Sequence, residues 1–419
     1  MDELFQRITH RPALSSNSYA SLSYRDYTVG LICALPIERA AAEGMLDEIH
    51  KFPPQRVSHD DNHYTFGRIG PHNVVVACLP TGMTGTTSAA RVANQMLSSF
   101  GSMKLRLLVG VGGGVPGRGA DIRLGDVVVS KPTATYGGVI QYDMGRTVGE
   151  SRFELTGMLN RPPDVLLSAV SGLQAKQIRE GRRLSEHLTV MMDRYRSLIP
   201  GYSCPGTEHD SFYDPGYEHI AGHTECDACD AAYLVRREPR SSGEPDIHYG
   251  LIATGNQVMK HGPTRDRLGN ALGVLCFEME AAGLMDNFPC LVIRGICDYA
   301  DSHKNKRWQG YAAATAAAYA KELLLSIMPG HNGSTHGVFE TNEGSGEPNP
   351  QMSPMRIVLR ECVRDTEGTL RCTSTEKKIV QNVSCEQCIQ SYPRAACPGL
   401  GLLFLFPLFT VHDLLSLHF

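Results

Sequence analysis

Signals for export, for nucleic-acid binding and for membrane insertion are missing from this chain of 419 residues. Residues 1–26 have no apolar core of the kind that a secretory signal needs. The formal net charge is −4, so no basic excess marks a surface for nucleic acid or acidic lipid. Residues 399–411 are apolar but are interrupted by Pro407 and fall short of the ~18 to 20 residues that cross a bilayer. We therefore expect an intracellular, cytoplasmic protein that binds neither nucleic acid nor membrane.

A disulfide framework and a complete zinc motif are also lacking. The chain has 13 cysteines, but without an export signal they are expected to be reduced thiols. One Cys-x-x-Cys pair, Cys226 and Cys229, has His219 or His223 close by and is a candidate zinc site. A single pair without a second one is a modest signal, and uncoordinated thiols in a folded loop are the favoured alternative.

The most informative stretch is residues 277–301, FEMEAAGLMDNFPCLVIRGICDYAD. Glu278 and Glu280 flank Met279, and a run of small residues that is expected to be helical follows. Residues 290–296 then read as a buried strand, with Asp298 just beyond its end. Open α/β sheets bind ligands at that edge, so Asp298 is a candidate site residue. The alternative is structural: a helix N-terminal charge at Glu280 and a helix cap at Asp298.

Earlier strand–turn units offer a second carboxylate and two glycine turns. Residues 27–35 read as a central strand, and Glu38 lies in the first turn of the helix that follows. A charge that complements the helix dipole is the alternative interpretation of Glu38. Residues 81–86 (TGMTGT) and the glycines at 112–114 each follow an apolar strand, where glycine allows the backbone to approach a ligand.

These motifs occur in one order that resembles the nucleoside phosphorylase and nucleosidase superfamily, especially its methylthioadenosine/S-adenosylhomocysteine nucleosidase branch. The resemblance rests on G-x-I-x-A-x-x-x-E ending at Glu38, on EMEAAG and on RGICDYAD, and it covers residues 27–328. It implies an α/β domain with a central, mostly parallel, twisted sheet and helices on both faces. A long insertion at about 145–245, with helices across 161–196, departs from compact family members.

The resemblance also assigns roles. It implies that Asp298 protonates the leaving purine, that Glu38 activates the attacking water, and that Glu280 binds the ribose hydroxyls. The remaining substrate contacts that it implies, to ribose or purine, are Met279, Thr81, Gly82, Gly113, Val258 and Met259.

We therefore expect hydrolysis of the N-glycosidic bond of a small purine nucleoside, without a metal or redox cofactor. A phosphorylase that uses phosphate as co-substrate is the first alternative, with Arg39, Arg91 and Arg294 as candidates for the phosphate cage. A nucleoside-sensing module of a signalling protein with little turnover is the second, and an interaction domain is the third. A homo-oligomer is compatible with each.

The domain boundaries follow from composition. Residues 1–26 are Ser-rich and aperiodic and are expected to form a flexible arm before the domain at 27–328. An Ala-rich amphipathic helix across 309–328 should close that domain. Residues from about 330 to 398 turn polar and rich in Gly, Ser and Pro, and we expect a poorly ordered tail across 329–419.

Overall fold

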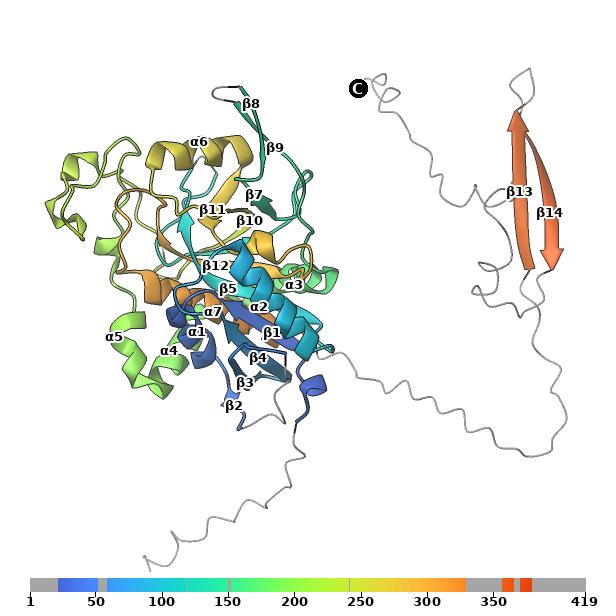
Figure 1. Cartoon of the computed structure of the whole chain (residues 1–419), viewed down its shortest axis with the longest axis horizontal. Coiled ribbons are helices and arrows are strands. Elements are labelled where there is room, and N and C mark those ends of the chain that lie inside the picture. Colours follow the sequence, from blue (N-terminus) through green and yellow to red (C-terminus); the bar gives the residue numbers. More distant parts are fainter. Residues whose placement is uncertain are drawn as a thin grey trace, which may run out of the picture. The chain divides into compact units, whose positions relative to one another are not determined.

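The computed structural model describes residues 22–51, 59–117, 119–149, 152–240, 242–328, 356–364 and 370–378. The chain divides into two compact units, Met1–Asn332 and Gly333–Phe419. Most of the predicted N-terminal arm and the apolar residues 399–411 lie outside the described residues. The first unit contains the predicted α/β domain (Figure 1).

A ten-stranded sheet forms the centre of that unit, in the order β11-β10-β6-β12-β5-β1-β4-β3-β2 with β7 paired to β10. Most neighbouring pairs in the middle of the sheet are parallel, as predicted. Its strands are β1 (Val29–Cys33), β2 (Glu48–Ile49), β3 (Tyr64–Ile69), β4 (His72–Cys78), β5 (Leu105–Gly114), β6 (Val127–Ser130), β7 (Val139–Gln141), β10 (Ile247–Thr254), β11 (Val274–Glu278) and β12 (Leu291–Asp298).

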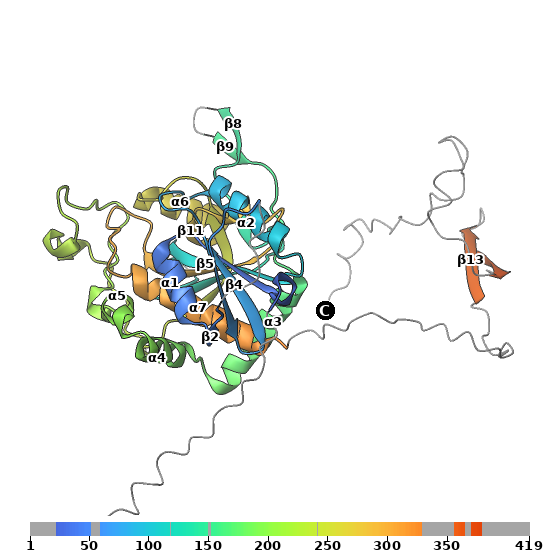
Figure 2. The same ribbon diagram turned by 60° about the horizontal axis from the view of Figure 1, so that its bottom comes forward.

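Alternation along the strands divides the core into two layers, one on each face of the sheet. Leu31 of β1 packs into one hydrophobic cluster and Ile32 into the other, because successive side chains of a strand point to opposite faces. Helices cover both faces, which confirms the predicted fold class (Figure 2). The helices are α1 (Pro36–Gly44), α2 (Thr86–Ser99), α3 (Asp164–Glu180), α4 (Leu184–Arg194), α5 (Ile199–Tyr202), α6 (Gly262–Leu272) and α7 (Gln309–Ser326).

Strand β11 completes a ring of strand pairings, which brings the ends of several strands together. β11 pairs with β10 in parallel and with β5 antiparallel, so β11, β10, β6, β12 and β5 form a closed ring of pairings. In this register Gly113 of β5 is the partner of Phe277 on one side and of Asp298 on the other. The ends of three strands that are distant in sequence therefore meet at Gly113.

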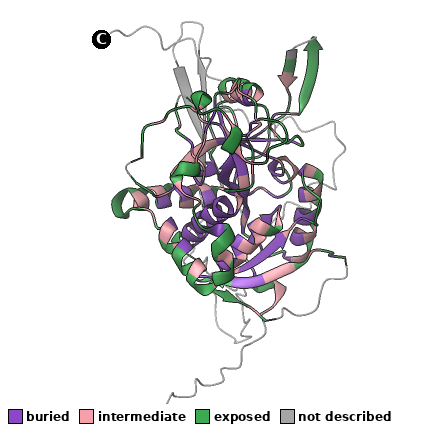
Figure 3. Ribbon diagram, turned by 90° about the vertical axis from the view of Figure 1, so that its left-hand side faces the viewer, coloured by how far each residue is buried: buried purple, intermediate pink, exposed green. Residues whose placement is uncertain are grey.

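The last helix of the domain differs from the prediction. α7 is buried on all sides from Gly310 to Leu324, whereas the sequence predicts an amphipathic helix. Its small residues allow this burial, because α7 lies against β5 and β12 on one side and against α1 and α4 on the other. A Cβ at Gly295 of β12 would overlap the backbone carbonyl of Ala312, so the close approach depends on glycine there. Figure 3 shows buried helix turns inside the domain.

The segment after Glu280 is also shorter than predicted. The expected helix is a single 3-10 turn, η6 (Ala281–Gly283), followed by further turns before β12. The Glu278 side chain explains the arrangement. Its carboxylate accepts hydrogen bonds from the amides of Glu280 and Ala281 and fixes the chain there. Asp298 is the last residue of β12 rather than the residue beyond it.

The insertion contains the two predicted helices, α3 and α4, followed by loops with short 3-10 turns: η2 (Arg196–Leu198), η3 (Thr207–His209), η4 (Cys226–Ala228) and η5 (Ala231–Tyr233). Its end is anchored to the sheet through Asp126, which accepts two hydrogen bonds from Arg240 and one from His248. Asp126 is 1% exposed, and these contacts give it a structural role. A hairpin of β8 (Gly145–Gly149) and β9 (Arg152–Leu155) extends away from the sheet (Figures 1 and 2).

Both predicted flexible ends contain ordered pieces. Residues 24–26 form the turn η1 (Tyr24–Asp26), and the ring of Tyr24 packs against Phe66 and Phe100, which fixes the end of the predicted arm. In the second unit, β13 (Arg356–Arg364) pairs antiparallel with β14 (Leu370–Lys378). The rest of that predicted tail lies outside the described residues. Among the described residues, no helix is both long and apolar enough to cross a membrane.

We expect the first unit to fold without the second. The last turns of the domain are held by their own contacts: His72 bonds to the carbonyl of Ile327 at 2.8 Å, and Lys321 pairs with Asp47 at 2.6 Å. A protein that ends after Asn332 should therefore be soluble and should melt within a few degrees of the full chain, measured by circular dichroism and calorimetry. An insoluble or strongly destabilised truncation would place part of the core beyond residue 332.

Candidate active site

The three carboxylates singled out by the sequence line one pocket of about 240 Å³ at the ends of the strands. Glu38 comes from the start of α1, Glu280 from the turn after β11, and Asp298 from the end of β12. Each is at most 4% exposed. Tertiary structure has thus brought together acids that are up to 260 residues apart in sequence, 298 minus 38.

Backbone amides hold Glu38 in place. Its Oε2 accepts from the amides of Ala34 and Leu35 at 2.7 and 2.9 Å, and its Oε1 accepts from the amide of Val111 at 2.8 Å. The bond to Leu35 is the helix-capping contact that the structural interpretation of Glu38 predicts, yet the same side chain lines the pocket. Oε1 retains a lone pair for a further donor.

Burial sets the protonation of Glu38. Desolvation raises the pKa of its carboxyl above the ordinary range, against the lowering effect of Arg294 and the three amides. A carboxylate with a raised pKa is a stronger base than an exposed one, so the position suits proton abstraction from a bound water.

Arg294 partly compensates the negative charge of the group of acids. It is 1% exposed, projects from the middle of β12, and donates one guanidinium nitrogen to both Glu278 and Glu280. Glu38 faces its other terminal nitrogen across Gly110, because a Cβ added there would lie 2.5 Å from each. Removing one partner of such a buried ion pair typically costs about 3–5 kcal/mol.

Glu280 is held more loosely than Glu278. Its Oε1 accepts from the amide of Gly85 at 3.2 Å and its Oε2 from Arg294 at 3.3 Å. Desolvation raises the pKa of Glu280, and the charges of Glu278 and Glu38 add to the increase while Arg294 opposes it. The long contacts leave lone pairs on both oxygens for ligand hydroxyls.

Asp298 has two groups of partners. Its Oδ1 accepts from the amide of Ala300 at 2.9 Å, and its Oδ2 lies 2.6 Å from the Lys304 ammonium and 3.1 Å from the Cys297 thiol. Ala300 has φ of 53°, the left-handed conformation that is unfavourable for a residue with a side chain. Gly113 leaves room for this turn, since a Cβ there would lie 2.7 Å from Oδ1 of Asp298.

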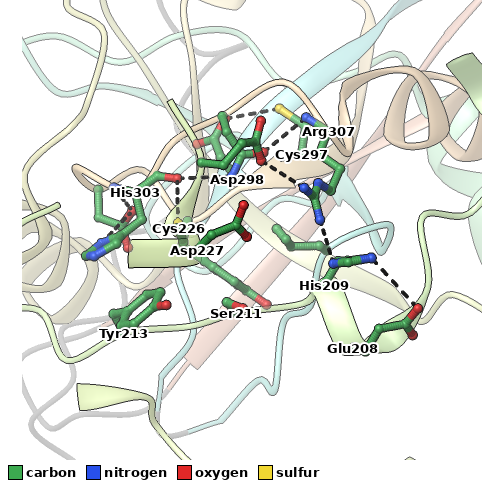
Figure 4. A pocket seen from close by; sticks show the side chains of 15 residues that line it. Glu208, His209, Ser211, Tyr213, Cys226, Asp227, Cys297, Asp298, His303 and Arg307 are labelled. Carbon is green, nitrogen blue, oxygen red and sulfur yellow. Dashed lines mark hydrogen bonds and ion pairs between the residues drawn. The ribbon is translucent and has the colours of Figure 1, made fainter. Parts of the chain in front are cut away.

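Asp298 also lines a second pocket, on the side of the insertion. This pocket, of about 150 Å³, contains His209, Cys226, His303 and Arg307 among its lining residues (Figure 4). Asp298 and Cys297 line both pockets. The acid at the end of β12 therefore lies between the strand ends and the insertion.

The predicted substrate contacts are divided by the structure. Gly113, Val258, Met259 and Met279 line the pocket of the three carboxylates. Thr81 and Gly82 are exposed and are not among its lining residues; Thr84, three residues further along the same loop, takes that place. The sequence predicted that this loop contributes to the pocket, but it did not predict which residue of the loop lines it.

The lining residues that sequence reasoning missed include Phe277, Lys304 and Gln309. Phe277 is an aromatic residue in a pocket where the sequence pointed only to aliphatic side chains, and it packs edge-on against Tyr142 at 5.4 Å. The signal for Lys304 was available, because a basic residue follows Asp298 within one short loop.

The three arginines considered for a phosphate cage each contact other side chains. Arg294 is the buried partner of the glutamates. Arg39 bonds to Glu43 and Thr65, and Arg91 lies 3.4 Å from Asp61; both line a separate pocket together with Thr81. Lys304 is the only basic side chain among the described residues that line the pocket of the three carboxylates.

Comparison with known proteins gives relatives of two kinds. A nucleotide-binding leucine-rich repeat-like protein of Hyaloscypha variabilis is 45% identical over 309 residues, which are 74% of this chain and 30% of that protein. A 5′-methylthioadenosine/S-adenosylhomocysteine nucleosidase of Mycobacterium bovis is 24% identical over 310 residues, 72% of this chain and 97% of the enzyme. The chain thus spans less than a third of the fungal relative.

Among solved structures, the futalosine hydrolase of Helicobacter pylori matches with a TM-score of 0.46 and 15% identity, over 72% of this chain and 99% of the enzyme. A model of the phosphorylase superfamily matches residues 28–327, which begin before β1 and end after α7. That span includes the whole pocket of the three carboxylates. The chain therefore belongs to the phosphorylase superfamily.

Proposed function

We propose that the protein hydrolyses the N-glycosidic bond of a purine nucleoside. The observation that carries the proposal is the pocket itself: four buried carboxylates line it, the three named above and that of Glu278, and Lys304 is its only basic lining residue in the described part of the chain. Water needs a base, which Glu38 provides. Phosphate would need a cationic cage, and a buried carboxylate beside it would add repulsion.

Each carboxylate then has one task. A water at Oε1 of Glu38 gives a proton to that oxygen, and its own oxygen forms the new bond to C1′ of the ribose. The bond from C1′ to the purine nitrogen breaks, and its electron pair leaves with the base. Glu280 accepts hydrogen bonds from the ribose hydroxyls, and its charge stabilises the cationic sugar in the transition state.

Asp298 and Lys304 act on the purine. The pair holds the proton that the departing base takes up at N7 through the Asp298 carboxyl, so the base leaves neutral. Burial tends to lower the pKa of Lys304, but the Asp298 charge outweighs it and raises that pKa. Phe277, Val258 and Met259 supply the apolar side chains against which a purine can lie.

The fungal relative favours a second candidate function. It is named as a nucleotide-binding leucine-rich repeat-like protein, and the matched residues are less than a third of its length. In such a setting this domain would bind a nucleoside and report it to the rest of a larger protein. A nucleoside panel separates the candidates: free base without phosphate supports the hydrolase, and ligand-induced stabilisation without product supports the sensor.

The choice of nucleophile can be tested at Glu38. Glu38→Gln should reduce cleavage in phosphate-free buffer by roughly 10²-fold or more, because general base catalysis contributes that much. Adding phosphate should not restore the wild-type rate. Glu43→Gln is the matched control, since Glu43 lies on the same helix and bonds to Arg39 and Thr65 instead. Wild-type activity that depends on phosphate and yields ribose 1-phosphate would contradict hydrolysis.

The acid can be tested at Asp298. Asp298→Asn should slow base release by roughly 10²-fold or more, since an amide cannot transfer the proton. The loss should be larger for bases that leave poorly than for activated nucleosides, because only poor leaving groups need protonation. Melting temperature checks the fold. An equal loss for both classes of nucleoside would indicate a positioning role for Asp298.

The ribose contact can be tested at Glu280 with ribosides and 2′-deoxyribosides. Glu280→Gln should erode the preference for ribosides, whereas equal losses in both classes would remove the 2′-hydroxyl contact. Because burial raises the pKa of Glu280, wild-type kcat/KM should still increase with pH above ~4.3, where an ordinary glutamate is half ionised. The ionised form is the active one, so this increase should flatten in the Gln variant.

A further inference from the structure

A group of metal-binding side chains lies in the insertion, outside the carboxylate pocket. One ligand atom each of His219, Cys226 and Cys229 lies within 4.8 Å of the others, and all three residues are partly buried. The turn η4 explains how the two cysteines meet: the amide of Cys229 bonds back to the carbonyl of Cys226 at 2.9 Å. That spacing is the one in which a Cys-x-x-Cys turn presents two sulfurs to one ion.

The hydrogen bond that His219 makes leaves its other ring nitrogen available for a metal. Its Nε2 lies 3.1 Å from the carbonyl oxygen of Glu225. A carbonyl oxygen only accepts, so Nε2 carries the hydrogen and Nδ1 keeps the lone pair. Metal-bound histidines commonly donate their second nitrogen to a carbonyl in this way, which fixes both the tautomer and the ring.

A second histidine, His303, lies beside this group, and its ring nitrogens make no hydrogen bond among the described residues. Its side chain is 4% exposed. Its closest acid, Asp301, is 3.8 Å away from Nδ1, which is too far for a hydrogen bond. Its ring stacks on Tyr213 at 4.1 Å and meets His219 edge-on at 5.4 Å. A buried imidazole without partners is costly unless something else binds it.

We infer that Cys226, Cys229 and His219 bind a zinc ion, with His303 as the fourth ligand after a small rotation of its side chain. Two thiolates and two imidazoles in a tetrahedron are a usual set for structural zinc. The sequence pointed to His223 as readily as to His219, but His223 is exposed and does not belong to the group.

The ion would tie the insertion to the loop after β12. That junction already has three contacts: the amide of His219 donates to Ser302 at 3.0 Å, the Cys226 sulfur lies 3.9 Å from the carbonyl of His303, and Arg307 pairs with Glu225 at 3.2 Å. Figure 4 shows Cys226, His303 and Asp298 around the same pocket.

Lys304 follows His303 directly along the chain and pairs with Asp298, so the zinc reaches Asp298 only through His303 and Lys304. The ion has a structural role and takes no part in the reaction.

The test measures zinc in the purified full chain by mass spectrometry of the metal. Wild type should contain about one zinc per chain, as a four-ligand site requires. Cys226→Ser, Cys229→Ser and His219→Ala should lose it, and His303→Ala should weaken its retention against a chelator. Cys204→Ser and His223→Ala are matched controls from the same insertion, both exposed, and should retain it.

Cobalt exchange into the wild-type protein provides a second measurement that no variant can obscure by misfolding. Co²⁺ should give the thiolate charge-transfer absorption of a tetrahedral site with two sulfurs. Protein that takes up no zinc, a Co²⁺ spectrum without thiolate bands, or a disulfide between Cys226 and Cys229 would overturn the inference, and so would loss of zinc in His223→Ala. All these readouts are made without substrate, so they stand or fall separately from the proposed nucleosidase activity.

Discussion

The pocket at the strand ends depends on one buried cation. Arg294 lies inside the sheet at 1% exposure and compensates the charges of Glu278, Glu280 and Glu38. One guanidinium cannot neutralise three carboxylates, and the excess negative charge adds to desolvation in raising the pKa of Glu280. The same cation therefore makes the burial of these acids tolerable, while the pKa of Glu280 stays above its ordinary value.

The position of Arg294 on β12 is linked to that of Asp298 at the end of the same strand. Arg294 and Asp298 lie on the same strand, so the pairing of β12 with β5 sets both the charge centre and the acid. Small residues on the neighbouring strand make the approach possible: Gly110 admits Arg294 and Glu38, and Gly113 admits Asp298. Lys304 pairs with the Asp298 carboxylate, and the loop that carries Lys304 packs against the insertion.

Much of the fold and part of the site could be predicted from sequence. Apolar strands, a Pro-started helix at Glu38 and the acid after a late strand are local signals, and they led to the correct fold class and to the acids that line the pocket. Other predictions needed distances that no local pattern contains. The segment after Glu280 reads as helix, but amide bonds to Glu278 turn it into a 3-10 turn. The sequence of α7 predicts an amphipathic helix, but Gly295 allows the helix to be buried between the sheet and α1.

The sequence by itself determined which chemical groups are present, in which order, and on which type of element, because strand alternation, helix caps and glycine turns are properties of neighbouring residues. Only the tertiary structure decided which of those groups meet. It placed Arg294 among glutamates inside the sheet, Thr84 instead of Thr81 at the pocket, and His219 instead of His223 beside the two cysteines. The physical reason is that these meetings depend on strand register and on the packing of loops distant in sequence, which follow from the whole core.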